Sequence, residues 1–282
     1  ALIDDGKTIP FIARYRKELT GSLDDQILRE LSDRLTYLRN LEIRKSEVSS
    51  SIAEQGKLTE EISSALDKAE TLVEVEDIYR PFKPKRKTRA SIAREKGLEV
   101  LADLIGRQDD KLDLHNEAQK FINVENGLET EEEVIQGASD IIAENVSDDA
   151  ELRKSIRKLY EKAAKIESRA SDENAETVYQ NYYEFCEPVS KIADHRILAL
   201  DRGEKEGALK VSVSIDEEFC FSIAERKYVI NNTDSGNIVK AAVQDSCKRL
   251  IMPSVEREIR AELTARAAEG AIKVFSSNLR QL

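Results

Sequence analysis

Tryptophan is absent from this chain of 282 residues, and proline and glycine are scarce, at five and eleven residues. So few turn-forming residues disfavour sandwiches and barrels, which need many tight turns. No apolar run approaches the roughly 20 residues that a membrane-spanning helix requires. Because 35% of the residues are charged, the composition predicts a soluble, mainly α protein that does not contact a membrane.

Cysteine and histidine are too few and too scattered for the common reactive sites. The three cysteines are odd in number and widely spaced, which fits neither a disulfide framework nor a zinc site and suits a reducing cytoplasm. The two histidines stand far apart, and no HExxH, CxxC, GxGxxG or Walker-type loop occurs. We therefore expect no metal, no cofactor and no catalytic residue in this chain, and predict that it is not an enzyme.

Negative charge is concentrated in one block. The chain has 44 basic and 55 acidic residues, a net charge of −11, and residues 109–151 hold 14 acidic residues against two basic ones. Residues 1–97 are near neutral, but they contain a dense positive stretch that only Glu95 opposes: Lys83, Lys85, Arg86, Lys87, Arg89, Arg94 and Lys96. This distribution argues against nucleic-acid binding over the whole surface and favours local contacts.

The hydrophobic pattern is mostly helical. Apolar spacings of three and four predict a long helix from a capping box at Ser22 to Gln55, and helices over 59–73, 90–96 and 99–106. Two more helices, joined by a tight turn, are predicted over 130–170, the first starting at a capping box of Thr130 and Glu133. These two form a candidate helix-turn-helix unit.

The last third mixes one strand signal with helices. Alternation over 209–215 predicts a strand, with residues 219–223 as its possible pairing partner. Helices are expected over 235–252 and 254–282. Proline lacks the N–H group that a helix interior needs, so Pro253 is expected to interrupt them.

A resemblance to a known family is carried by several strings. Residues 9–18 read IPFIARYRKE, residues 78–88 read IYRPFKPKRKT, residues 195–207 read HRILALDRGEKEG and residues 274–280 read VFSSNLR. These strings resemble motifs in the N-terminal region of the Tex family of bacterial transcription accessory proteins, which is related to eukaryotic transcription elongation factors. The resemblance runs along the chain and is patchiest across 105–175.

The resemblance implies a fold and a domain order. It implies a mainly α, multi-helix array with a helix-turn-helix subdomain and a small β element near 209–223. We expect an N-terminal helical domain over 1–110, a helix-turn-helix-like acidic/basic subdomain over 111–175, and a helical domain with a short strand pair over 176–282. In this family an RNase-H-like domain, helix-hairpin-helix units and an S1 domain follow, so we expect a fragment that lacks them.

The positive stretch supplies the main nucleic-acid candidates. Clustered lysine and arginine side chains release counterions from phosphates, which makes this loop a possible contact. The candidates are Lys83, Lys85, Arg86, Lys87 and Arg89. Tyr79 and Phe82 beside them could stack on bases. The alternative is that these rings belong to the core and the charges only solvate a loop.

Weaker candidates lie in two other places. Arg14, Arg16 and Lys17 flank Tyr15, but the alternative is a structural motif in which Phe11, Ile12 and Tyr15 are buried and Arg14 pairs internally. A basic stripe would share one face of the second helix of the candidate helix-turn-helix unit, the face that could enter a major groove: Lys154, Lys158, Lys162, Lys165 and Arg169. The preceding helix is strongly acidic, so pairing between the two helices explains this stripe more simply.

These observations favour a cytoplasmic, nucleic-acid-associated transcription accessory factor. This part of it would act as a helical scaffold and partner-docking surface. RNA or single-stranded DNA would bind mainly through the absent domains, and a basic protein could dock on residues 109–151. Two alternatives stay open: the helical arm of a nuclease or resolvase-like enzyme, and a purely protein-interaction module.

Overall fold

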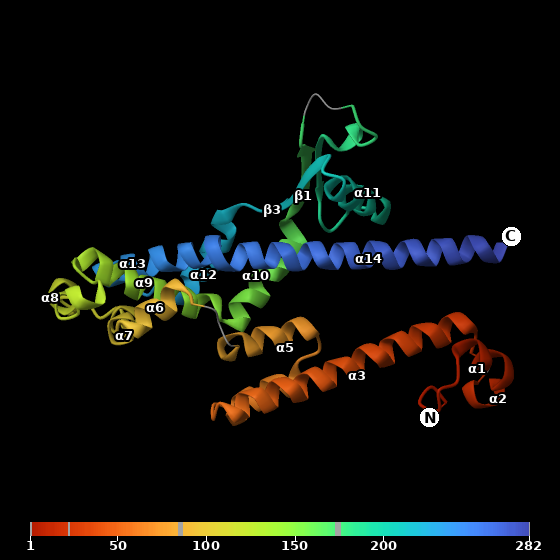
Figure 1. Ribbon diagram of the computed structural model, residues 1–282, viewed down its shortest axis with the longest axis horizontal. Helices are drawn as coiled ribbons and strands as arrows, with labels where there is room; N and C mark the ends of the chain where they lie inside the picture. The colour runs from red at the N-terminus through yellow and green to blue at the C-terminus, as the bar shows by residue number, and fades with distance from the viewer. Residues whose placement is uncertain (1, 22, 84–86, 173–175, 282) are drawn as a thin grey trace. The chain divides into compact units, whose positions relative to one another are not determined.

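The computed structural model describes residues 2–21, 23–83, 87–172 and 176–281 (Figure 1). Most of these residues are helical and one small sheet is present, so the predicted mainly α class with a small β element is confirmed. The chain divides into two compact units, residues 1–83 and 84–282. The boundaries of the three domains expected from the sequence stay a prediction. None of the helices in the described ranges is both long and apolar enough to cross a membrane.

The first unit is built on one long helix. Helix α3 (Asp25–Glu54) begins where the Asp24 carboxylate accepts a hydrogen bond from the Ile27 N–H at 2.9 Å. Ser22, the predicted cap, lies outside the described residues. The other helices of this unit are α1 (Ile9–Tyr15), α2 (Lys17–Thr20), α4 (Glu60–Lys68) and α5 (Leu72–Tyr79). Leu41, Val48 and Ile52 of α3 form the core of this unit with side chains of α4 and α5.

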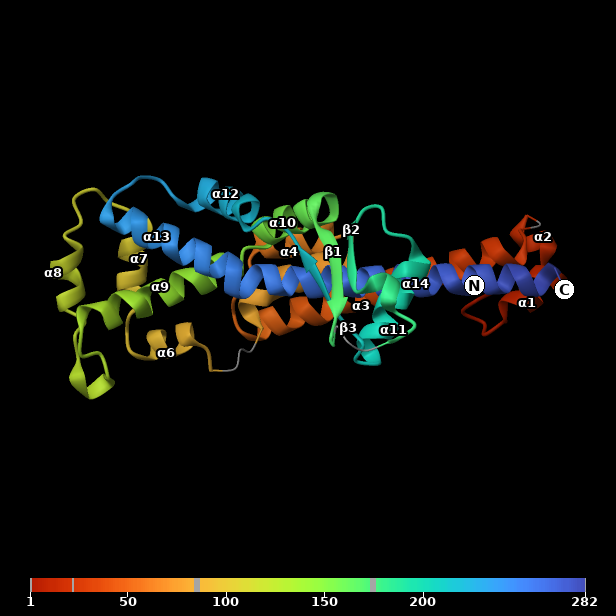
Figure 2. The ribbon, with the colours of Figure 1, turned by 90° about the horizontal axis from the view of Figure 1, so that it is seen from above.

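The second unit gathers its elements along two consecutive helices, α13 (Asp234–Asp245) and the long helix α14 (Met252–Gln281), as Figure 2 shows. At the α13 end lie α6 (Arg89–Glu95), α7 (Glu99–Arg107), α8 (Leu114–Gln119), α9 (Glu131–Ser147) and α12 (Glu217–Tyr228). Helices α10 (Ala150–Ala163) and α11 (Asp194–Lys205) pack against α14. One continuous hydrophobic core runs through these elements.

The sheet lies beside the first turns of α14, where the Val213 N–H of the third strand donates to Glu256, and it corrects two predictions. Strand β1 (Lys165–Ala170) stands between β2 (Glu184–Pro188) and β3 (Leu209–Ser214), antiparallel to both. The predicted strand over 209–215 is confirmed as β3. The predicted helix through residue 170 is wrong, because Ala164 leaves the helical conformation and its carbonyl accepts from the Val189 N–H. Residues 219–223 belong to α12, which Asp216 caps, and form no strand.

Pro253 does not separate two helices. It lies in the first turn of α14, directly after a π-helical turn over Ser246–Ile251 that continues from α13. Proline has no N–H to give to the carbonyl one turn earlier. A wider π turn is a common way to absorb such a mismatch while the helical path continues.

The string over 195–207 has a packing role. Gly203 of α11 is buried, and a Cβ atom there would lie 2.6 Å from Cδ1 of Leu209 and 3.1 Å from the Tyr179 ring. The Tyr179 hydroxyl donates to Glu206 at 2.9 Å, and Arg196 pairs with Glu187 of β2. This motif therefore fixes α11 against the sheet.

The three cysteines are unpaired thiols. Cys220 and Cys247 are buried, and burial raises the pKa of each thiol to about 12. Cys186 is exposed on β2. No group of three or more histidine, cysteine, aspartate or glutamate side chains in the described ranges is arranged to hold a metal ion.

A buried ion cluster joins α10 to α14. The guanidinium of Arg153, with no exposed surface, donates to Oε1 of Glu258 at 2.6 Å and to the Ser254 hydroxyl at 3.2 Å. Arg157 donates to the other oxygen of Glu258 at 2.7 Å. One carboxylate thus pairs with two buried cations, and its removal breaks both of these ion pairs.

We expect Glu258→Ala to lower the free energy of unfolding by about 3 kcal/mol, the scale seen when one member of a buried ion pair is removed. Glu269→Ala on the same helix is the control, because its 4.0 Å pair with Lys273 is exposed and such pairs contribute at most about 1 kcal/mol. Urea titration followed by circular dichroism measures both. Equal losses in the two variants would show that the Glu258 cluster has no special role.

Candidate functional site

The main basic candidates are exposed where the structure describes them. Lys83 belongs to the first unit and lies 3.6 Å from the Glu76 carboxylate. Lys87 and Arg89 belong to the second unit; Lys87 lies 3.7 Å from Glu95, and Arg89 forms no ion pair with a described residue. Lys85 and Arg86 lie outside the described residues. The free guanidinium of Arg89 at the start of α6 is therefore the best placed of these cations.

The aromatic residues next to this stretch belong to the first unit's core. Tyr79 and Phe82 are half-buried and pack against the cluster around Val48 and Ile52. The Tyr79 hydroxyl is hydrogen-bonded to the Ser51 hydroxyl at 3.0 Å. These contacts favour the core alternative over base stacking for both rings.

The N-terminal motif is only partly buried. Ile12 is buried and Phe11 half-buried, but Tyr15 is 60% exposed, so the expected burial of Tyr15 is wrong. The Tyr15 ring contacts the ring of Phe11, with the two centroids 5.3 Å apart, and this contact leaves most of Tyr15 exposed. Arg14, Arg16 and Lys17 are all exposed, and Arg16 lies 3.8 Å from Glu18. The expected internal partner of Arg14 is not found among the described residues.

The predicted basic stripe is split between two elements. Lys154, Lys158 and Lys162 lie on α10, where Lys158 and Lys162 are exposed. Lys165 and Arg169 lie on β1, so they do not extend that helical face. Buried carboxylates of the acidic block pair with cations of other elements: Asp140 with Arg249 at 3.5 Å, Glu144 with Arg94 at 2.5 Å, and Asp149 with Lys227.

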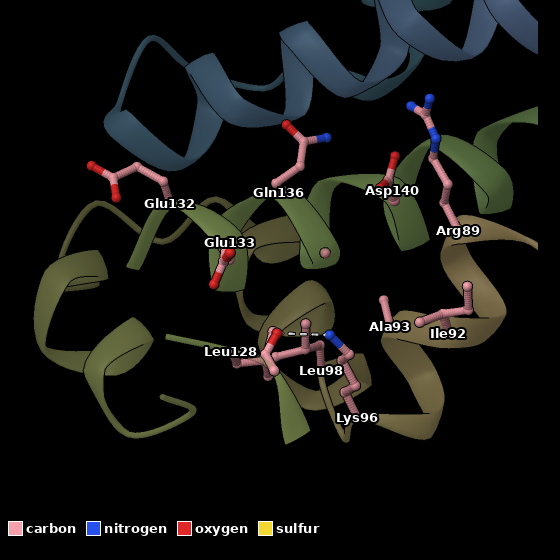
Figure 3. A pocket seen from close by; sticks show the side chains of 12 residues that line it. Arg89, Ile92, Ala93, Lys96, Leu98, Leu128, Glu132, Glu133, Gln136 and Asp140 are labelled. Carbon is pink, nitrogen blue, oxygen red and sulfur yellow. Dashed lines mark hydrogen bonds between the residues drawn. The ribbon is translucent and has the colours of Figure 1, made fainter. Parts of the chain in front are cut away.

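A groove of about 550 Å³ lies between α6 and α9 (Figure 3). We call it the α6–α9 groove. Its floor is apolar and consists of Ile92, Ala93, Leu98 and Leu128. Arg89 and Lys96 stand on the α6 side, and Glu132, Gln136 and Asp140 stand one turn apart along α9. The groove therefore combines an apolar floor with rims of opposite charge.

Polar contacts hold the two walls of the groove together. Thr88 caps α6 in a box with Ser91, and its hydroxyl donates to the Glu144 carboxylate at 3.0 Å. Arg94 donates to Glu144 at 2.5 Å and to the Asn145 side chain at 2.8 Å. Glu144 is only 7% exposed, so this carboxylate is a buried link between α6 and α9.

The start of α9 is fixed as the sequence predicted. Thr130 and Glu133 form the expected capping box, with the Glu133 N–H donating to the Thr130 hydroxyl at 3.2 Å. Further along the helix, burial raises the pKa of the Asp140 carboxyl, while Arg249 and Arg89 act in the opposite direction. At Gly137, α9 lies close to the Leu98 side chain. A Cβ atom at this position would lie only 2.4 Å from Cδ1 of Leu98. No local sequence pattern indicates the groove, because only this packing brings its segments together.

A second hollow, of about 470 Å³, lies on the outer face of the sheet. Arg169 and Lys210, directly opposite each other in the strand register, line it together with Glu167, Glu184 and the exposed Cys186. Its lining carries equal numbers of positive and negative side chains. Its charges therefore discriminate less between cationic and anionic ligands than those of the α6–α9 groove.

These features define a helical scaffold with a local basic segment and a charged-rim groove. Residues 1–53 match the family model of the Tex-like protein N-terminal domain, and residues 109–275 match that of the Tex central region. The chain belongs to the Tex family. The expected resemblance is thereby confirmed.

Named relatives support the same assignment. The chain is 46% identical over its full length to protein YdcI of Bacillus subtilis, of which it covers 40%, and 37% identical to the transcriptional accessory protein Tex of Neisseria gonorrhoeae, of which it covers 38%. It is 32% identical to the human S1 RNA-binding domain-containing protein 1, covering 30% of that protein. The chain thus spans about two-fifths or less of these relatives. At family level it is related to transcription accessory proteins.

We expect Arg94→Ala to destabilise the second unit by about 3 kcal/mol, because it removes the guanidinium that pairs with the buried Glu144 carboxylate at 2.5 Å. Arg107→Ala is the matched control, since Arg107 is exposed and forms no ion pair with a described residue. Thermal unfolding followed by circular dichroism compares the two variants. An Arg94→Ala protein as stable as the Arg107→Ala protein would show that this link does not hold α6 to α9.

Proposed function

We propose that this chain is the helical scaffold of a nucleic-acid-associated transcription accessory factor and itself contributes no catalytic group. The family assignment supports the transcription role, and the name of the human relative, an S1 RNA-binding domain-containing protein, supports RNA as a ligand class. RNA or single-stranded DNA is then bound mainly by parts of the protein beyond this chain. The compartment proposed is the cytoplasm.

Direct contact of this chain with nucleic acid is proposed for the segment Lys83–Arg89. The observation that carries this proposal is the exposure of Lys83, Lys87 and Arg89 within a chain of net charge −11. Arg89 is free to pair with a phosphate. Because the chain as a whole is negatively charged and the basic segment is short, the contact is weak, and its affinity falls as salt rises.

The acidic block is proposed as a docking surface for a basic protein. Its buried carboxylates are compensated within the chain, but Glu125, Glu129, Glu132 and Glu151 are exposed and form no ion pair with a described residue. Duplex DNA reading by α10 is disfavoured, because exposed Glu151 and Glu161 share the exposed side of that helix with Lys158 and Lys162. Phosphates near this surface meet carboxylates of both helices.

We expect replacement of Lys85, Arg86, Lys87 and Arg89 by glutamate to abolish binding of a single-stranded oligonucleotide. The wild-type salt slope, up to about 3 for four contacts on a single strand, should flatten. Fluorescence polarisation at several salt concentrations measures both. The matched control replaces Lys111, Lys191, Lys205 and Arg226 by glutamate, four exposed cations elsewhere in the second unit. Equal affinity for both variants would remove the segment as the contact.

A further inference from the structure

The α6–α9 groove has one exposed apolar side chain on its floor. Ile92 is 38% exposed, whereas Ala93, Leu98 and Leu128 beside it are buried in the core of the second unit. The volume of the groove, about 550 Å³, lies in the range of sites that take a compact ligand or a bulky side chain. Covering Ile92 is favourable in proportion to the apolar area removed from water.

The groove is formed before any partner arrives. The Glu144 link with Thr88 and Arg94 fixes α6 against α9, and Lys96 donates to the Gly127 carbonyl at 2.8 Å on the opposite side. A ligand entering a site of this kind does not have to order its walls, which lowers the free-energy cost of binding.

Two charged side chains on the rims are exposed and form no ion pair with a described residue, Arg89 and Glu132, whereas Lys96 and Glu133 are held by backbone groups. In Figure 3 Glu132 and Arg89 stand at opposite ends of the row that Gln136 and Asp140 complete. Arg89 also acts electrostatically on Asp140, the carboxylate beside it, which is paired with Arg249. Glu132 therefore makes one end of the groove negative, and at the other end two arginines stand around one carboxylate.

This pattern selects a polypeptide over other ligands. A nucleic-acid strand placed in the groove would bring phosphates against Glu132, Glu133 and Asp140, and its charges do not alternate. A purely apolar ligand would leave Arg89 and Glu132 unsatisfied. A peptide segment can present a basic residue, a bulky apolar residue and an acidic residue in order along its length.

We propose that the α6–α9 groove binds a short segment of a partner protein in which a bulky apolar side chain is flanked by a basic and an acidic residue. The apolar side chain packs on Ile92, the basic residue faces Glu132 and the acidic residue faces Arg89. The proposal rests on the docking role proposed above and names the partner's chemistry. It does not depend on nucleic-acid binding.

The test uses the whole 282-residue chain and a library of random 12-residue peptides displayed on phage. Enriched sequences should share a basic–apolar–acidic order. A synthetic, fluorescein-labelled peptide of that consensus should lose affinity at least about tenfold on Ile92→Glu, which places a charge on the floor. Val100→Glu is the control, because Val100 is 61% exposed on the neighbouring helix α7 and outside the groove.

A charge-swapped chain gives a second, independent result. The double variant Arg89→Glu, Glu132→Lys keeps the floor and the net charge, and it should enrich peptides in which the acidic and basic residues exchange places. Circular dichroism confirms that each variant is folded. No enrichment, or a consensus unchanged by the swap, would overturn the groove proposal.

The outcomes also separate the groove from the wider docking role. Peptides that bind equally to wild type and Ile92→Glu, but lose affinity when Glu125, Glu129 and Glu151 become glutamine, would overturn the groove and leave the acidic docking surface standing. If peptide affinity falls with Ile92→Glu and is unchanged by the three glutamine substitutions, the result would support the groove alone.

Discussion

The second unit depends on polar side chains that the first half of α14 directs to its neighbours. Glu258 holds two arginines of α10, and Glu256 accepts from the Val213 N–H of β3 at 2.9 Å. Arg260 pairs with Asp201 and Glu204 of α11, and Arg266 pairs with Asp194 at the start of that helix. The pairs of Glu258 are buried and costly to break, whereas the more exposed pair of Arg266 mainly fixes direction. The long helix therefore sets both the place of the sheet and that of α11.

Ion pairing between distant segments also explains why the acidic block, residues 109–151, does not disrupt the fold. Its most buried carboxylates, Asp140 and Glu144, face arginines from the π turn and from α6, segments far away in the sequence. What remains uncompensated is exposed, on the outer turns of α8 to α10. The carboxylates of the acidic block are thus paired where they are buried, and those without a cationic partner among the described residues stand at the surface in contact with water.

Local signals were read correctly from the sequence and non-local ones were not. The capping box at Thr130, the alternation of β3 and the glycine stop after α3 all act within a few residues, and the structure has each of them. Ile166 keeps helical spacing from Ile156 and Leu159, so no local pattern identifies β1 as a strand. Its conformation depends on its pairing with β2 and β3, which come later in the chain. Likewise the basic segment is a local string, whereas the groove joins residues 89–98, 127–128 and 132–140 only after folding.

Arg89 belongs to both proposed surfaces, since it ends the basic segment and stands on the rim of the groove. A guanidinium paired with a phosphate cannot also hold a peptide carboxylate, and each partner must then lower the affinity of the other by the same factor. A saturating single-stranded oligonucleotide should therefore weaken binding of the groove peptide, and the effect should shrink as salt rises. Arg89→Gln should remove this antagonism while leaving the apolar anchor in place. Fluorescence polarisation of the labelled peptide, with and without oligonucleotide, measures the coupling. Independent binding in the wild-type chain would mean that Arg89 serves at most one of the two ligands.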